Sequence, residues 1–72
     1  MFYVGQKVII DCHDADYMQG RALENGMIGE VLGIDRRRHF PVKVNVKRHI
    51  GPAECCFDFD ELKPVPNTAK II

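Results

Sequence analysis

The amino-acid sequence predicts an all-β fold, a small barrel of five short strands with one short helical turn before the last strand. In the segment 42–47 three valines alternate with polar residues, and this period of two is typical of a strand with one buried face. The segment 27–34 is mostly apolar, with Glu30 as its one charged residue, and contains Gly29 and Gly33; glycines in strands mark bulges or close backbone approaches. The polar residues 35–39 predict a turn that joins the two strands into a hairpin.

The N-terminal third predicts one strand and one long loop. Residues 2–10 contain a turn glycine, Gly5, followed by a β-rich apolar run. Residues 11–25 show no sustained period and predict a loop with a short turn of helix at 22–24. At about 15 residues this loop exceeds the usual connection length, and such loops in compact domains are often functional. The alternative is a connecting loop without a binding role, packed by its own apolar side chains.

The C-terminal part predicts a second turn and a closing strand, with Gly51-Pro52 as the turn signal. The expected elements are a turn at 48–53, a short strand at 54–57, a helical turn at 57–62 and an edge strand at 63–65. We therefore expect a single domain over residues 1–66 and a flexible tail over 67–72.

Composition agrees with one small domain. The chain has 72 residues, 46% of them hydrophobic, and it contains no apolar run near the ~20 residues that a membrane span needs. The first ten residues lack the basic flank and long apolar core of a signal peptide. Three cysteines, an odd and sparse set, favour reduced thiols. We expect no membrane association and a cytoplasmic location.

Charge is distributed unevenly although the net charge is zero. Residues 1–35 carry two basic and six acidic side chains, residues 36–49 carry six basic and none acidic, and residues 50–72 carry two and four. Non-specific affinity for nucleic acid comes from excess positive charge, so a neutral domain is a poor general polyanion binder.

The order of elements resembles that of the Src-homology-3-like small barrels, and within them the KOW-type and related prokaryotic or phage modules. The resemblance covers about residues 2–66. It is carried by Val4-Gly5-Gln6-Lys7-Val8, by Gly26, Gly29 and Val31, and by Phe57 with Glu61-Leu62-Lys63-Pro64-Val65. It implies that the long loop, the turn at 36–39 and the turn at 58–62 rim one face. This barrel hosts many unrelated activities, so the resemblance specifies function weakly.

Basic residues of the central hairpin form the first candidate binding set. They are Arg36, Arg37, Arg38, His39, Lys43, Lys47 and Arg48. Adjacent arginines can grip phosphates or carboxylates through forked donors. The alternative is a solvated charge set that protects an exposed strand from aggregation.

The second candidate set is acidic and has Tyr17 and Phe59 as its nearby aromatic residues. Its members are Asp11, Asp14 and Asp16 of the long loop with Asp58, Asp60 and Glu61. In barrel relatives that bind proline-rich peptides, an acidic loop meets a basic ligand residue while aromatic rings hold the prolines. This chain has no tryptophan and no ALYDY-like aromatic pair, which argues against that ligand class. An acidic rim beside a basic turn suits a protein partner of complementary charge.

Metal binding and catalysis find little support in the sequence. Cys12-His13 and Cys55-Cys56 contain zinc-ligand types, but there is no C-x-x-C spacing, and adjacent strand residues point to opposite faces. One cysteine of each of these two segments is better explained as a small side chain that fills the core. The chain has no serine and shows no nucleophile–base pair. The plasmid-type dihydrofolate reductases share a small-barrel architecture, but their Val-Gln-Ile-Tyr strand is absent here.

These observations favour a binding module without catalysis, cofactor or metal, whose partner is a protein. By analogy of fold, it is an accessory or inhibitory factor of bacterial or phage origin. The alternative is a KOW-like module that binds nucleic acid or the ribosome through the basic strand, and a small-barrel reductase is a remote third. The sequence leaves the oligomeric state open.

Overall fold

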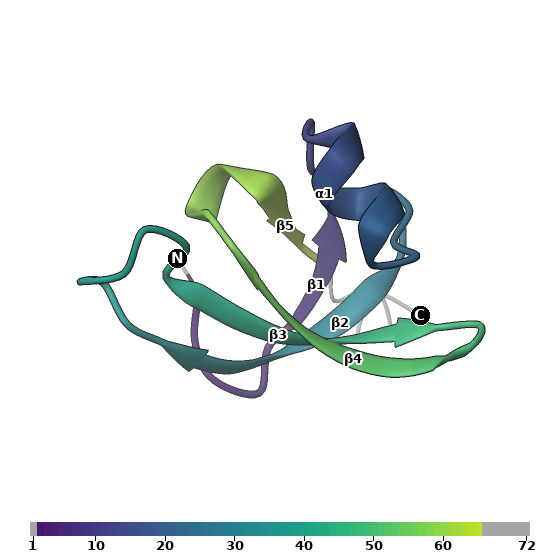
Figure 1. Cartoon of the computed structure of the whole chain (residues 1–72). Coiled ribbons are helices and arrows are strands. Elements are labelled where there is room, and N and C mark those ends of the chain that lie inside the picture. The colour runs from purple at the N-terminus through teal and green to yellow at the C-terminus, as the bar shows by residue number, and fades with distance from the viewer. Residues whose placement is uncertain (1, 66–72) are drawn as a thin grey trace, which may run out of the picture.

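A computed structural model describes residues 2–65 of the chain, which fold into one antiparallel sheet of five strands (Figure 1). The strands are β1 (Lys7–Ile10), β2 (Ile28–Ile34), β3 (Val42–Arg48), β4 (Gly51–Phe57) and β5 (Leu62–Pro64). Their spatial order is β4-β3-β2-β1-β5. A short helix, α1 (Ala15–Gly20), and a single 3₁₀ turn, η1 (Phe59–Glu61), lie on the same side of the curled sheet. The all-β class, the five strands and the helical turn before the last strand are confirmed.

The sheet curls without closing into a full barrel. β4 pairs only with β3, and β5 pairs only with β1, so these two strands are the edges of the described sheet. The helical turn before β5 is stabilised by a capping box, in which the Asp58 side chain accepts from the Glu61 amide and the Glu61 side chain accepts from the Asp58 amide. The Asp58 side chain also accepts from the Phe59 amide. The tail expected over 67–72 lies outside the described residues.

The core lies on one face of the sheet, as the alternating pattern of β3 predicts. Val42, Val44 and Val46 are fully buried, whereas Lys43 and Lys47 are exposed. The other members of the hydrophobic core cluster come from every remaining strand, from α1 and from the long loop: Val8, Ile10, Cys12, Met18, Leu23, Val31, Cys55, Phe57 and Leu62. Each strand therefore gives one face to a single apolar cluster.

Two glycines of β2 have the roles that glycines in strands predict. A side chain at Gly29 would collide with the side chain of Val44 and lie 3.0 Å from the carbonyl oxygen of Asn45, so the two strands approach closely here. Gly33 follows a shift of register between β2 and β3, where Leu32 is the extra residue of a bulge.

The long loop contains a helix at a place that the sequence did not indicate. The helical turn expected at 22–24 is wrong; the helix is α1, at Ala15–Gly20. Asp14 caps it by accepting a hydrogen bond from the Tyr17 amide, and the buried Met18 attaches it to the core. Six residues are too few for a visible helical period, so tertiary contacts such as the burial of Met18 decided the position of α1.

Residues at the two ends of the long loop are bridged by one side chain. Asn25 accepts a hydrogen bond of 2.7 Å from the Cys12 amide and donates one of 3.0 Å to the Cys12 carbonyl. Ala22, with a φ of 56°, redirects the chain after the helix. This bridge closes the loop onto the end of β1 and fixes where α1 lies.

The second hairpin is tighter than predicted. The expected turn and the strand at 54–57 are both present, but their bounds differ, because β3 continues to Arg48 and β4 already begins at Gly51. Gly51 has a φ of 125°, which the tight turn requires and glycine tolerates. Pro52 lies within β4, where its missing amide is acceptable because β4 is an edge strand.

Candidate binding surface

Three segments that are far apart in the sequence lie near the end of the sheet where β3 begins and β4 ends. They are α1, the loop at 35–41 between β2 and β3, and η1. The ring centroids of Tyr17 and Phe40 lie 6.2 Å apart, and the guanidinium carbon of Arg36 lies 5.2 Å from the centroid of the Phe59 ring. We name Tyr17, Phe40 and Phe59 the aromatic rim. Its existence agrees with the expectation that these three segments border one face.

Tyr17 is held at the rim by contacts on several sides. Its hydroxyl donates a hydrogen bond of 2.6 Å to the carbonyl of Cys56, and its ring meets Phe57 edge-on at 5.8 Å. The guanidinium of Arg21, one turn along the helix, lies 3.9 Å from the ring centroid. Desolvation by burial is the main cause that raises the pKa of the Tyr17 phenol. The ring is therefore fixed in place by its surroundings.

Phe59 and Phe40 complete the rim from the other two segments. Phe59 stacks against Phe2 with a centroid separation of 6.1 Å and an interplanar angle of 14°. Phe40 is 40% exposed and forms a T-shaped pair with the His39 ring, with centroids 4.8 Å apart. Phe40 therefore exposes apolar surface to solvent, and its contacts with the rings of Tyr17 and His39 set its position.

Asp35 organises the arginine turn, which we define as residues 36–38. Its carboxylate accepts hydrogen bonds from both the amide and the Nε of Arg37, at 3.1 and 3.2 Å, and lies 3.9 Å from Nε of Arg38. The hydrogen bonds from Arg37 lower the pKa of the Asp35 carboxyl group. One carboxylate thus orders the turn and offsets part of its positive charge.

The basic residues of β3 do not form one continuous cationic face. Lys43 lies 3.8 Å from the carboxylate of Glu54 on the neighbouring strand. Arg48 donates from Nε to the Gly51 carbonyl at 2.9 Å and from a terminal nitrogen to the Arg21 carbonyl at 2.7 Å. Arg48 therefore attaches the end of α1 to the second hairpin, a structural use of its donors.

Lys47 belongs to a different part of the surface from the arginine turn. It pairs with Pro52 across the second hairpin and borders a hollow together with His49 and Glu24. At ~3.3 Å per residue, Lys47 is about 13 Å from Lys43 along the strand. Of the basic set that the sequence indicated, Arg36, Arg37, Arg38, His39 and Lys43 gather at one end of β3, and Lys47 and Arg48 lie at the other.

The acidic set of the long loop is used partly for local structure. Asp14 is the N-cap of α1. Asp16 lies in the first turn of α1 and is exposed. An acidic side chain at a helix N-terminus is favourable because the amides there carry partial positive charge. Of this predicted set, the structure therefore brings only the aromatic residues, Tyr17 and Phe59, into the aromatic rim.

The three cysteines are free thiols in different surroundings. Cys12 and Cys55 are buried in the core, as the core-filler interpretation expects, while Cys56 is half-buried on the opposite face of β4. Desolvation raises the pKa of both buried thiols, and Cys12 also donates a hydrogen bond of 3.1 Å to the Glu61 carboxylate. Within residues 2–65, no group of three or more His, Cys, Asp or Glu side chains is arranged to hold a metal ion.

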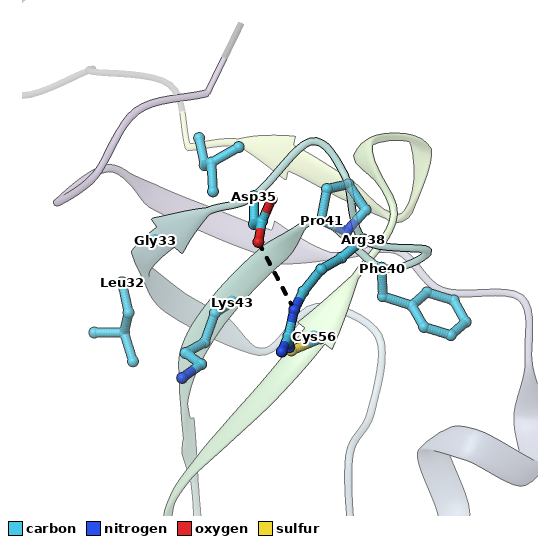
Figure 2. Close-up of a pocket in the computed structure, with 9 residues that line it drawn as sticks. Leu32, Gly33, Asp35, Arg38, Phe40, Pro41, Lys43 and Cys56 are labelled. Atoms are coloured by element: carbon cyan, nitrogen blue, oxygen red, sulfur yellow. Dashed lines mark ion pairs between the residues drawn. The ribbon is translucent and has the colours of Figure 1, made fainter.

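A pocket of about 360 Å³ opens beside the arginine turn, on the face of the sheet away from the core (Figure 2). We name it the outer pocket. Its lining includes Leu32, Ile34, Arg38, Phe40, Lys43 and Cys56. Arg38 extends from the loop toward Cys56, with Asp35 beside it (Figure 2). The sequence indicated its two cations but not its apolar members, because these come from two strands and a loop whose register was unknown.

Comparison with family models, with curated proteins and with solved structures gives no match. Within the described residues, no helix has both the length and the apolar character needed to cross a membrane.

Proposed function

We propose that this chain is a non-catalytic module that docks onto another protein through the aromatic rim and the arginine turn. The observation that carries the proposal is the ring contact between Tyr17 and Phe40, together with the guanidinium groups of Arg21 over Tyr17 and of Arg36 over Phe59. Aromatic residues and arginine are enriched at protein interfaces and dominate their binding energy. Here they come from three segments and border one end of the sheet.

The strand order supports kinship with the Src-homology-3-like small barrels. In this chain β2, β3 and β4 follow one another as antiparallel neighbours, and β1 pairs with both β2 and the closing strand β5. The long loop between β1 and β2, the loop at 35–41 and the 3₁₀ turn before β5 border the rim. This kinship is part of the proposal, and the fold alone assigns no ligand.

Charge pairing favours a protein over nucleic acid as the partner. A phosphate backbone is bound by cations that are free to replace its counterions. Here the carboxylates of Asp35 and Glu54, which lie beside the arginine turn and Lys43, would repel a run of phosphates, and the donors of Arg48 are used by backbone carbonyls. A KOW-like mode along the basic strand is therefore the weaker candidate.

The test is affinity capture with the whole chain as bait, with and without nuclease, followed by a direct binding measurement with the captured protein. The comparison variant replaces Arg36, Arg37 and Arg38 by alanine, and circular dichroism verifies that it is folded. We expect capture to survive nuclease and to be lost with the triple variant. Lys63→Ala, which changes an exposed cation of β5, is the matched control and should retain capture. Capture that disappears with nuclease would overturn the proposal in favour of nucleic acid.

A further inference from the structure

We infer that the outer pocket receives an acidic segment of the protein partner, with one carboxylate between Arg38 and Lys43 and flanking apolar side chains against Leu32 on one side and Phe40 on the other (Figure 2). The inference rests on the proposed function and adds the chemistry of the partner. It starts from a pocket that combines cationic side chains with exposed apolar ones.

The two cations keep donors available for a ligand. The nitrogen of Arg38 nearest to Asp35 is Nε, at 3.9 Å, and the Lys43 ammonium lies 3.8 Å from Glu54, so both existing ion pairs are long. The side chains of Arg38 and Lys43 are 68% and 51% exposed. A carboxylate that approached both would make shorter, charge-assisted hydrogen bonds with them.

Apolar residues of the same pocket favour a peptide over a phosphate backbone. Leu32 is 38% exposed and Phe40 is 40% exposed, and both line the pocket with Ile34. Apolar side chains on either side of the carboxylate would bury the surfaces of Leu32 and Phe40, whereas a sugar–phosphate strand has no comparable apolar group to place there. The carboxylates of Asp35 and Glu54 would also repel a run of phosphates more than a single carboxylate.

Bulge geometry explains how these groups come together. Leu32 is the extra residue of the bulge in β2, between Val31, which pairs with Val44, and Gly33, which pairs with Lys43. Lys43 pairs in turn with Cys56 of β4, so that residues of three strands stand side by side under Arg38. Cys56 thereby becomes part of the pocket lining and can report its occupancy.

The experiment uses the Cys56 thiol as that reporter. A random-peptide display library is selected on the folded chain, and the enriched peptides are then tested for protection of Cys56 against N-ethylmaleimide. Mass spectrometry locates each adduct. Because Cys12 and Cys55 are only 4% and 6% exposed, their labelling would reveal unfolding in the same measurement.

We expect enriched peptides that carry Asp or Glu flanked by apolar residues and that slow Cys56 labelling at least about tenfold, as occupancy near saturation requires. Arg38→Ala and Lys43→Ala should each weaken peptide binding roughly ten- to a hundredfold, the loss expected for one charge-assisted hydrogen bond. Lys63→Ala is the control, because Lys63 has the same 68% exposure as Arg38 and also pairs with an aspartate, Asp11.

Three results would overturn the inference. One is a set of enriched peptides that are basic, or that bind without protecting Cys56 and are indifferent to Lys43→Ala; the proposed docking function would then stand without this pocket. Another is protection of Cys56 by duplex RNA or DNA at physiological salt, which would assign the pocket to phosphate. Enrichment of no sequence, together with failure of protein capture, would contradict both proposals.

Discussion

The hydroxyl group of Tyr17 donates a hydrogen bond of 2.6 Å to the backbone carbonyl of Cys56, which lies 39 residues further along the chain. Because Cys56 belongs to the edge strand β4, this bond ties the long loop to the sheet and occupies one carbonyl of an exposed edge. The same ring contacts Phe40 and Phe57. One side chain therefore links the loop, the core and the aromatic rim.

Removing this hydroxyl should destabilise the domain without disrupting its packing. We expect Tyr17→Phe to lower the free energy of unfolding by about 1 kcal/mol, the usual net contribution of one hydrogen bond. Urea denaturation followed by circular dichroism measures the change. Tyr3→Phe, at a residue that is 63% exposed, is the control and should have no measurable effect. Equal stability of Tyr17→Phe and the wild type would show that the bond does not hold the loop.

Gly29→Ala should destabilise the pair formed by β2 and β3. The added methyl group would meet the Val44 side chain and the Asn45 carbonyl, and overpacking of this kind costs about 1–3 kcal/mol. The matched control is Gly33→Ala in the same strand, where an added methyl group meets nothing within 4 Å and the backbone needs no positive φ. Thermal denaturation of the two variants compares them. A Gly29→Ala variant as stable as Gly33→Ala would contradict the close approach.

Val44→Asp should unfold the domain. Val44 is fully buried, and an unpaired carboxylate at this position costs several kcal/mol, which is comparable to the whole stability of about 3–5 kcal/mol that a domain of this size usually has. Lys47→Asp places the same group on the exposed face of the same strand and should remain folded. If Val44→Asp melted cooperatively, by circular dichroism, with the same midpoint temperature as the wild type, the assignment of the buried face of β3 would be refuted.

Stability should fall in alkaline solution. The folded pKa values of Cys12 and Cys55 are raised above the ordinary 9.0, and that of Tyr17 is raised above 10.0, mainly by desolvation. The folded chain thus holds these protons more tightly than the unfolded chain does. The stabilisation that these three groups give the folded chain is complete below pH 9.0 and is lost as the pH rises through their folded-state pKa values.

Urea denaturation at a series of pH values tests this expectation. The double variant Cys12→Ala/Cys55→Ala should be less stable at neutral pH, because two core side chains are shortened, and should lose stability less steeply above pH 9.0. An equal or steeper alkaline loss in the double variant would show that other groups cause the effect.

Nucleic-acid binding should be weak, salt-sensitive and indifferent to sequence. The arginine turn is the main concentration of cations, and Asp35 offsets part of its charge. We expect short duplex DNA and RNA to bind more weakly than micromolar at physiological salt, with a dependence on salt that reflects only the few phosphates neutralised. Fluorescence anisotropy provides the measurement. Submicromolar affinity that the triple alanine variant abolishes would reverse the order of the two candidate functions.

The alternation of valines in the segment 42–47 determined the buried face of β3, because a period of two depends only on the local geometry of a strand. Gly29 and Gly33 marked a close approach and a bulge for the same local reason. The helical turn before the last strand was also visible in the sequence.

Only the tertiary structure decided where the long loop folds and which charges meet. The position of α1 depends on burial of Met18 and on the bond from Tyr17 to β4, and neither leaves a periodic signal in six residues. Lys43 meets Glu54 because the register between β3 and β4 makes them diagonal neighbours. The basic run seen in the sequence is therefore divided in space, and the outer pocket exists because three strands and a loop bring together side chains that the chain itself keeps apart.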